Sequence, residues 1–258
     1  MTPGPISLTL LEKAATDNGF DLAGSRDGAW LPFASSQTSL RIWLGVLNGS
    51  LYLVAFSRRE VCAALPELGA PWANPLPPGA CAARGLADVA SLHRLIRRAF
   101  QLSRVLPDAP LQVFLERTAA LPRTTEAERL VVQRAGQDLF RTGLLDYWDG
   151  VCAVTGLAVP ELLRASHIKP WADCDSDAER LDVFNGLLLA PQLDAVFDRG
   201  FITVDDAGLV IVSDLLDPAS RQRLGLDRPL WVQRLVDPHR AFLAWHRERV
   251  FRGPRCIG

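Results

Sequence analysis

The sequence has little lysine and no closely paired cysteines. Lysine occurs only at Lys13 and Lys169, so arginine supplies almost all of the positive charge. The five cysteines are widely spaced and form no CxxC pair, which argues against both a disulfide framework and a structural zinc ribbon. We therefore interpret them as reduced thiols, at Cys62, Cys81, Cys152, Cys174 and Cys256.

Long apolar runs are also missing. No segment is apolar over the length that crosses a bilayer, and the N-terminus lacks the basic start and apolar run of a signal peptide. We therefore expect a cytoplasmic protein with no membrane partner. The net charge of −1 and the pI of about 6.4 exclude a general coat on nucleic acid, but they leave a local phosphate-binding patch open. With 48% hydrophobic residues, the chain can bury a sizeable core.

The most informative part of the chain begins with two short apolar runs. These runs, Val151–Thr155 and Leu162–Ile168, are separated by Gly156 and Pro160, and they predict two strands joined by a turn. His167 lies at the end of the second predicted strand, and a polar loop follows it.

A short helix is predicted next, over Ala190–Arg199. Pro191 suits its first turn, and Gly200 suits the position after its end. Asp194 and Asp198 are four residues apart and therefore project from one face of this helix. Two like charges there destabilise the helix slightly unless a cation lies between them. Carboxylate oxygens favour hard divalent ions such as magnesium or manganese.

His167 and Asn185 complete the candidate site. An imidazole accepts a proton near neutral pH, which suits His167 to activating water. A metal ion beside such a base stabilises charge on a phosphate and its leaving oxygen, and this is the arrangement for hydrolysing a phosphodiester. Asn185 either holds a loop across the site by hydrogen bonds from its side chain to backbone, or ligates the metal through its carbonyl oxygen.

Three segments of this region occur in a characteristic order: ASHIKPW, then ERLDVFNGLLL, then LDAVFDRGFITVDDAG. Together they resemble the HNH endonucleases of the ββα-metal type, in a branch associated with restriction systems and mobile-element defence. The resemblance extends over Thr125–Phe251. It implies an α+β chain, in which an N-terminal mixed sheet-and-helix domain precedes a C-terminal ββα-metal nuclease domain. It also implies DNA as the partner and a divalent cofactor, Mg²⁺ or Mn²⁺.

The resemblance gives each candidate residue a role. His167 corresponds to the general base, Asn185 to the middle residue of the HNH motif, and Asp194 stands in place of the usual last histidine. Asp198 is either a second metal ligand or part of an ion pair and cap at the helix end. Two features differ from the family. The residue before the base is often a metal-binding Asp or His but is Ser166 here, a poor ligand, and the zinc knuckles of many relatives are missing, so no structural zinc is expected.

The domain boundary is expected between residues 122 and 123. Residues 1–122 would form a recognition domain and residues 123–258 the nuclease domain. A capping box at Thr125 and Glu128 predicts a helix to about Tyr147, which leads into the nuclease strands.

Two local patterns stand out in the N-terminal half. Two β-rich runs joined by Asn48-Gly49 predict a hairpin, and the proline-rich residues 70–85 predict an ordered but irregular loop. Leu86–Val105 is predicted to be a helix.

The C-terminal part predicts further elements after the site. Residues 201–212 are expected to form a second hairpin and Leu230–Val236 a strand. The final helix, His239–Phe251, carries His239 and His246, which either enter the site or pack within the helix's surroundings.

Arginines supply most of the candidate DNA contacts. Those on the predicted helix 86–105 either contact phosphates or form a solvated helix face. Lys169 either contacts the DNA backbone or packs the Pro170 turn. The predicted DNA-binding residues are Lys169, Arg94, Arg97, Arg98, Arg134, Arg141 and Arg199.

We therefore expect a metal-dependent DNA endonuclease, a restriction enzyme whose N-terminal domain reads a sequence or a DNA modification. Modified bases are frequently read by flipping them into an aromatic pocket. The N-terminal half offers aromatic rings that core packing also explains, at Trp30, Phe33, Trp43, Tyr52 and Trp72. Two alternatives stay open: a nicking HNH enzyme of a mobile element or phage, and a non-catalytic DNA-binding module with a decayed site. Cutting both strands with one site per chain would indicate a homodimer.

Overall fold

The chain consists of two compact units, Met1–Leu106 and Pro107–Gly258. The boundary expected at residues 122 and 123 lies outside the described residues. The division falls earlier in the sequence because helix α4 (Ala109–Thr118) packs against helix α5 (Glu126–Tyr147) of the second unit. Within the described part of the chain, no helix combines the length and apolar character needed to span a bilayer. The computed structural model describes residues 5–65, 67–106, 109–119, 121 and 125–253.

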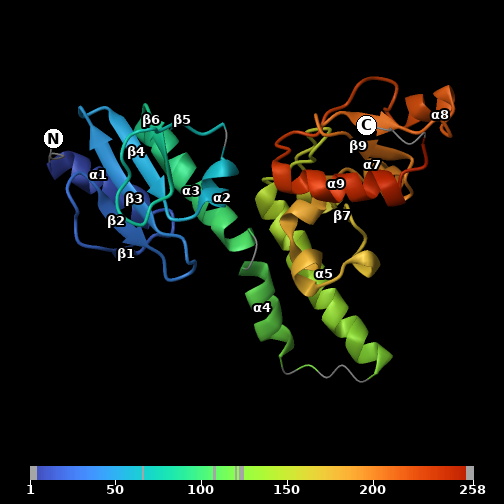
Figure 1. The fold of residues 1–258 in the computed structure, drawn as a ribbon, viewed down its shortest axis with the longest axis horizontal. Coiled ribbons are helices and arrows are strands. Elements are labelled where there is room, and N and C mark those ends of the chain that lie inside the picture. The colour runs from blue at the N-terminus through green and yellow to red at the C-terminus, as the bar shows by residue number, and fades with distance from the viewer. Residues whose placement is uncertain (1–4, 66, 107–108, 120, 122–124, 254–258) are drawn as a thin grey trace. The chain divides into compact units, whose positions relative to one another are not determined.

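The N-terminal unit is built on a six-stranded antiparallel sheet (Figure 1). Its central hairpin confirms the prediction. Asn48 and Gly49 both have positive φ, 52° and 77°, as the tight primed turn between two strands requires. In spatial order the strands are β1 (Leu22–Ala23), β2 (Leu31–Ala34), β3 (Ile42–Leu47), β4 (Leu51–Phe56), β6 (Ala82–Leu86) and β5 (Ala70–Pro71).

Three helices of this unit pack against the central strands. Helix α1 (Pro5–Thr16) contacts β3, and both α2 (Arg59–Ala63) and α3 (Val89–Val105) contact β4 and β6. The α3 helix begins at Val89, later than the predicted start at Leu86, because the Asp88 carboxylate accepts a hydrogen bond from the Ser91 backbone N–H, at 2.7 Å. Its apolar side is fully buried, through Leu92, Leu95, Ile96, Ala99 and Leu102.

A cluster around Trp43 forms a second packed region of the sheet. Trp43, Ala55 and Ala83 are cross-strand neighbours on β3, β4 and β6, and the two alanines leave room for the indole. Part of the covering comes from residues 70–85, which are more regular than predicted because β5 and β6 pair within them. The residues that pack against the cluster are Trp30, Trp72, Leu76 and Ala80.

The C-terminal unit combines helices with two-stranded sheets (Figure 1). The predicted capping box is confirmed: the Thr125 hydroxyl accepts from the Glu128 N–H, and the Glu128 carboxylate accepts from the Thr125 N–H at 2.8 Å. The elements after α5 are η1 (Pro160–Leu162), β7 (Arg164–His167), η2 (Trp171–Asp173), α6 (Asp177–Leu181), η3 (Val183–Asn185), β8 (Gly186–Leu189), α7 (Pro191–Asp198), β9 (Ile202–Val204), β10 (Val210–Val212), α8 (Pro218–Arg223) and α9 (Asp237–Arg249).

The first strand predicted for this unit is wrong. Val151–Thr155 forms a turn, in which the Gly156 N–H donates to the Cys152 carbonyl and Gly156 adopts a φ of 74°. The Cys152 sulfur accepts from the Thr155 N–H and helps to close the same turn. The chain therefore bends where the apolar run predicted an extended segment.

The partner of β7 is instead β8, which the sequence reading missed. The two strands are antiparallel, with Ser166 opposite Leu187 and His167 opposite Gly186. All residues of β8 are buried, so the segment lacks the alternation of polar and apolar residues that identifies a strand. The observed order is strand, loop, strand and helix, and α7 lies where the sequence predicted it.

The later elements agree with the prediction except for one strand. The β9–β10 hairpin and helix α9 are confirmed. Leu230–Val236 is not a strand, because Arg234 has a positive φ of 56° and only Trp231 bridges to Leu209. The described cysteines, Cys62, Cys81, Cys152 and Cys174, are free thiols, and Cys256 lies outside the described residues.

The cap of α5 predicts a measurable stability difference. Thr125→Ala removes the side chain that accepts from the Glu128 N–H, and we expect it to lower the free energy of unfolding by about 1 kcal/mol. Thr142→Ala is the matched control on the same helix, where the exposed hydroxyl donates only to the Asp138 carbonyl. We expect the control to be neutral or slightly stabilising in urea unfolding. Equal effects of the two substitutions would contradict the role of the cap.

Candidate active site

Two neighbouring residues at the end of β7 face different surroundings. Successive strand residues point to opposite faces, so Ser166 and His167 diverge. The Ser166 hydroxyl is buried on the α7 side and donates to Asp198 Oδ1 at 3.1 Å. The His167 imidazole stacks on the ring of Phe140 from α5, with centroids 3.7 Å apart and planes 14° from parallel. The edge of Trp171 meets the same imidazole, with centroids 5.6 Å apart.

The hydrogen bond of His167 fixes its tautomer. Its Nε2 lies 2.9 Å from the backbone carbonyl of Arg180, which can only accept, so Nε2 carries the proton and donates. The unprotonated nitrogen is then Nδ1, the atom able to accept a proton. Burial lowers the pKa of His167 to about 4, so the imidazole is neutral at physiological pH. An anionic phosphate beside it would raise that pKa and make the base stronger.

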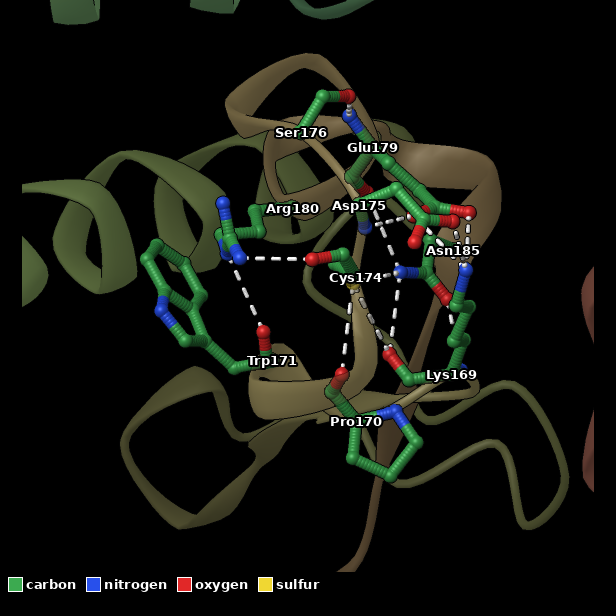
Figure 2. A network of polar contacts seen from close by, with 9 residues as sticks. All are labelled: Lys169, Pro170, Trp171, Cys174, Asp175, Ser176, Glu179, Arg180 and Asn185. Carbon is green, nitrogen blue, oxygen red and sulfur yellow. Dashed lines mark hydrogen bonds and ion pairs between the residues drawn. The ribbon is translucent and has the colours of Figure 1, made fainter. Parts of the chain in front are cut away.

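Asn185 ties together the loop that supplies the Arg180 carbonyl. Its side chain has no exposed surface, and its Oδ1 accepts from the Lys169 N–H at 2.8 Å. Its Nδ2 donates to the carbonyls of Lys169 and Glu179, each at 3.2 Å, and to the Cys174 sulfur at 3.3 Å (Figure 2). Of the two predicted roles, the geometry shows the loop-holding one, since all of these contacts join Asn185 to the loop.

Charged side chains reinforce the same loop (Figure 2). The Lys169 ammonium pairs with Asp175 at 2.8 Å and with Glu179 at 2.9 Å, and its side chain is 10% exposed. Its surroundings therefore favour packing of the Pro170 turn over contact with DNA. The Arg180 guanidinium donates to the carbonyls of Trp171 and Cys174 and closes the loop from the other side.

Asp194 and Asp198 lie together on α7, next to Ser166. Asp198 is exposed and Asp194 is half-buried. Desolvation raises the pKa of both carboxyls, and for Asp198 the negative charge of Asp194 adds to the rise, while hydrogen bonding from Ser166 opposes it. Desolvation and mutual repulsion make the two ionised carboxylates unfavourable by themselves. Together they form a donor set that fits a hard divalent cation.

The donor set is nevertheless small. Over the described residues, no group of three or more His, Cys, Asp and Glu side chains is placed to hold a metal ion. Asp194 and Asp198 supply two carboxylates, and the Ser166 hydroxyl beside them is a third oxygen donor. This set fits Mg²⁺ or Mn²⁺, since magnesium usually binds one or two carboxylates and keeps several waters.

A hollow of about 310 Å³ brings His167 and Asp198 to one place. Its lining includes Ser166, His167 and Asp198, together with Trp171 from the loop and His246 from α9. Although Ser166 and His167 leave β7 in different directions, both reach this hollow at the end of the strand. A phosphate in the hollow could therefore contact both the imidazole and an ion held by the acids.

These features coincide with a match to a known family. Residues 152–205 match the family model of the HNH endonucleases. The matched segment contains β7, the loop after it that Asn185 holds, β8 and α7, so the C-terminal unit contains an HNH domain. None of the curated proteins compared with the chain matches it.

Several residues around His167 were not predicted from the sequence. Phe140 and Trp171 hold the imidazole by ring contacts, and the Arg180 carbonyl orients it, although none of them was predicted. Ser166 was considered only as a poor metal ligand, whereas its hydroxyl bonds to Asp198. Sequence spacing could have suggested Phe140 alone, because it lies on the apolar side of the capped helix α5.

The two histidines of α9 are held by packing and hydrogen bonds. His246 is buried and lines the hollow, but both of its nitrogens have partners: Thr203 Oγ1 at 2.9 Å and the Phe197 carbonyl at 3.2 Å. His239 is also fully buried and lies among the rings of Tyr147, Trp148 and Phe184. These histidines were predicted either to enter the site or to pack around α9. Their buried surroundings agree with packing.

The side chains of the C-terminal unit that were predicted to contact DNA have different environments. Arg134 and Arg199 are exposed. The Arg141 guanidinium donates to the carbonyls of Leu163 and Pro160, at 2.7 and 3.0 Å, and so braces the segment before β7. Contact of these side chains with DNA stays a prediction.

The arginines of α3 belong to the N-terminal unit. Arg94 and Arg97 are exposed, and Arg98 is half-buried. Arg94 donates to the Ser91 hydroxyl at 2.9 Å and Arg97 to Asn18 Oδ1 at 3.2 Å. Their role as DNA contacts likewise stays a prediction.

The buried histidines predict a loss of stability in mild acid. Burial lowers the pKa of His167, His239 and His246 from 6.5 to about 4, so the unfolded chain takes up protons that the folded chain does not. Stability is then complete above pH 6.5 and falls as the pH drops from there towards about 4. Each histidine contributes at most about 3 kcal/mol to this fall.

Urea unfolding over this pH range measures the effect. His239→Phe places an uncharged ring in the same aromatic surroundings, and it should make the pH dependence shallower than in the parent chain. Unfolding free energies that stay constant across this range would contradict burial of the neutral imidazoles.

Proposed function

We propose that this protein is a metal-dependent DNA endonuclease that hydrolyses phosphodiester bonds. The match of residues 152–205 to the HNH endonucleases supports a nuclease function. The observation that carries the finer proposal is the hollow at the end of β7, which is lined by a neutral histidine and by an acid of α7.

In the proposed mechanism His167 acts as general base. Its Nδ1 accepts a proton from the water that attacks phosphorus. The charge that develops on the imidazole is stabilised by the Arg180 carbonyl, which accepts the Nε2 hydrogen bond throughout. Asn185 is a positioning residue, since it acts on the base through the loop and not on the substrate.

Asp194 and Asp198 would hold a divalent ion, with the Ser166 hydroxyl as an additional oxygen. When bound, Mg²⁺ or Mn²⁺ supplies positive charge to stabilise the phosphate and the departing oxygen. The proposed base and the proposed ion-binding acids pack on different sides of β7. His167 lies on the α5 side, and the acids lie on the α7 side.

We also propose that the protein is a restriction enzyme whose N-terminal unit selects the DNA. Residues 1–106 contain ten basic and seven acidic side chains, so this unit is positively charged although the whole chain is not. The alternative is a DNA-binding module without catalysis, which the small donor set around Ser166 favours. A homodimer is expected if both strands are cut.

The role of His167 predicts a loss of cleavage without loss of DNA binding. His167→Ala should lower the rate of plasmid cleavage in magnesium or manganese by about 10²–10⁴-fold, the usual contribution of a general base. Affinity for the same DNA, measured by gel shift without metal, should be unchanged. Cleavage at the parental rate would remove His167 from the mechanism.

The role of the acids predicts a changed metal requirement. Asp194→Asn and Asp198→Asn each remove one carboxylate, and we expect a rise of about tenfold or more in the manganese concentration needed for half-maximal cleavage. Asp214→Asn is the control, because its exposed carboxylate pairs with Arg221 away from the hollow. An equal change in all three variants would contradict a specific ion site.

The restriction proposal predicts selective digestion. Matched plasmids with and without base modification, digested with the parent enzyme and sequenced at their ends, should differ in cleavage or share one short sequence at the ends. An open-circular product that persists indicates nicking, and a linear product indicates cleavage of both strands. Uniform cleavage at unrelated sequences on both plasmids would contradict the restriction role but not the nuclease role.

A further inference from the structure

The N-terminal unit contains an aromatic hollow that the nuclease chemistry does not use. Its volume is about 400 Å³, within the range of small-molecule sites. Gly45 and Leu53 are paired across β3 and β4 and line it from the sheet, in the row of positions that also holds Trp43 and Ala55. The hollow is therefore built on regular strands rather than on loops alone.

Two indoles form its walls. Trp30 and Trp72 both line the hollow and both pack against the buried cluster around Trp43. A Cβ atom at position 45 would lie 3.4 Å from the Trp30 ring, so the glycine lets this indole lie close to the sheet. Packing on the sheet fixes the walls before any ligand arrives, which reduces the entropy cost of binding.

The lining is apolar except at one side. None of the described residues that line the hollow carries a charge, so it suits a neutral group rather than a phosphate. Asn74 lies at the exposed rim and offers an amide that both donates and accepts hydrogen bonds. The Trp72 Nε1–H is buried without a partner among the described residues.

We propose that this hollow receives a single nucleobase turned out of a DNA duplex. A nucleobase is the flat and neutral part of DNA, its faces stack on indoles, and its edge pairs with an amide. The inference rests on the proposed function, since it names the part of the DNA that the N-terminal unit would read. It makes Trp30 and Trp72 the stacking residues and Asn74 the residue that reads the edge of the base.

The test compares a fully paired DNA duplex with a duplex of the same sequence that contains one mismatched base pair. An unpaired base costs less to turn out than a paired one, so the full-length protein without metal should bind the mismatched duplex about tenfold more tightly than the fully paired duplex. Tryptophan fluorescence should fall as the base stacks. Trp30→Ala and Asn74→Ala should each abolish the preference.

Leu22→Ala is the matched control, because it removes an exposed apolar side chain from the same sheet outside the hollow. It should keep the preference in full. Asn74 is exposed, so its variant tests the inference even if Trp30→Ala fails to fold. Equal binding of both duplexes by the parent protein, or a preference that survives in Asn74→Ala, would overturn the inference and leave the indoles with packing alone.

Cleavage separates this result from the proposed function. A parent protein that cuts plasmid in manganese but shows no preference for the mismatched duplex would overturn the base-binding hollow and support the nuclease. A preference that depends on Asn74, in a protein that cuts no DNA, would support the hollow and overturn the nuclease.

Discussion

The geometry of the HNH domain depends on the hydrogen bonds of one buried amide. Asn185 joins the start of the loop after β7 to helix α6, and the carbonyl next to its Glu179 contact is the one that accepts from His167. Without these bonds, the loop would lose links to the end of β7, and the hydrogen bond from His167 Nε2 to the Arg180 carbonyl would no longer be held in place. A buried amide left unpaired would also cost about 1–3 kcal/mol for each missing bond.

The remaining contacts of the site arrange charge around this fixed loop. The Lys169 ammonium offsets part of the negative charge of Asp175 and Glu179 on the loop. The imidazole is kept neutral by burial, and the acids of α7 keep their negative charge at some cost. The C-terminal unit therefore places an uncharged imidazole and a pair of carboxyl groups in surroundings that differ in polarity.

Local patterns in the sequence name the candidate site residues, whereas one of the strands that carry them could not be recognised. His167, Asn185, Asp194 and Asp198 could be named because each belongs to a local pattern, either a motif or the spacing of one helix. β8 could not be recognised, because a strand buried throughout has no alternation to identify it. The contacts of Phe140, Trp171 and the Arg180 carbonyl with His167 could not be predicted either. They join positions far apart in the chain, and only the folded domain brings them together.

The most direct test of the account is the position of a bound metal ion. A crystal of the full chain with Mn²⁺ and a DNA duplex, measured at a wavelength where manganese scatters anomalously, locates the ion without assumptions about its ligands. The account predicts an ion about 2.1 Å from carboxylate oxygens of Asp194 and Asp198, with a phosphate between the ion and Nδ1 of His167. An ion bound elsewhere, or a phosphate beyond the reach of His167, would contradict it.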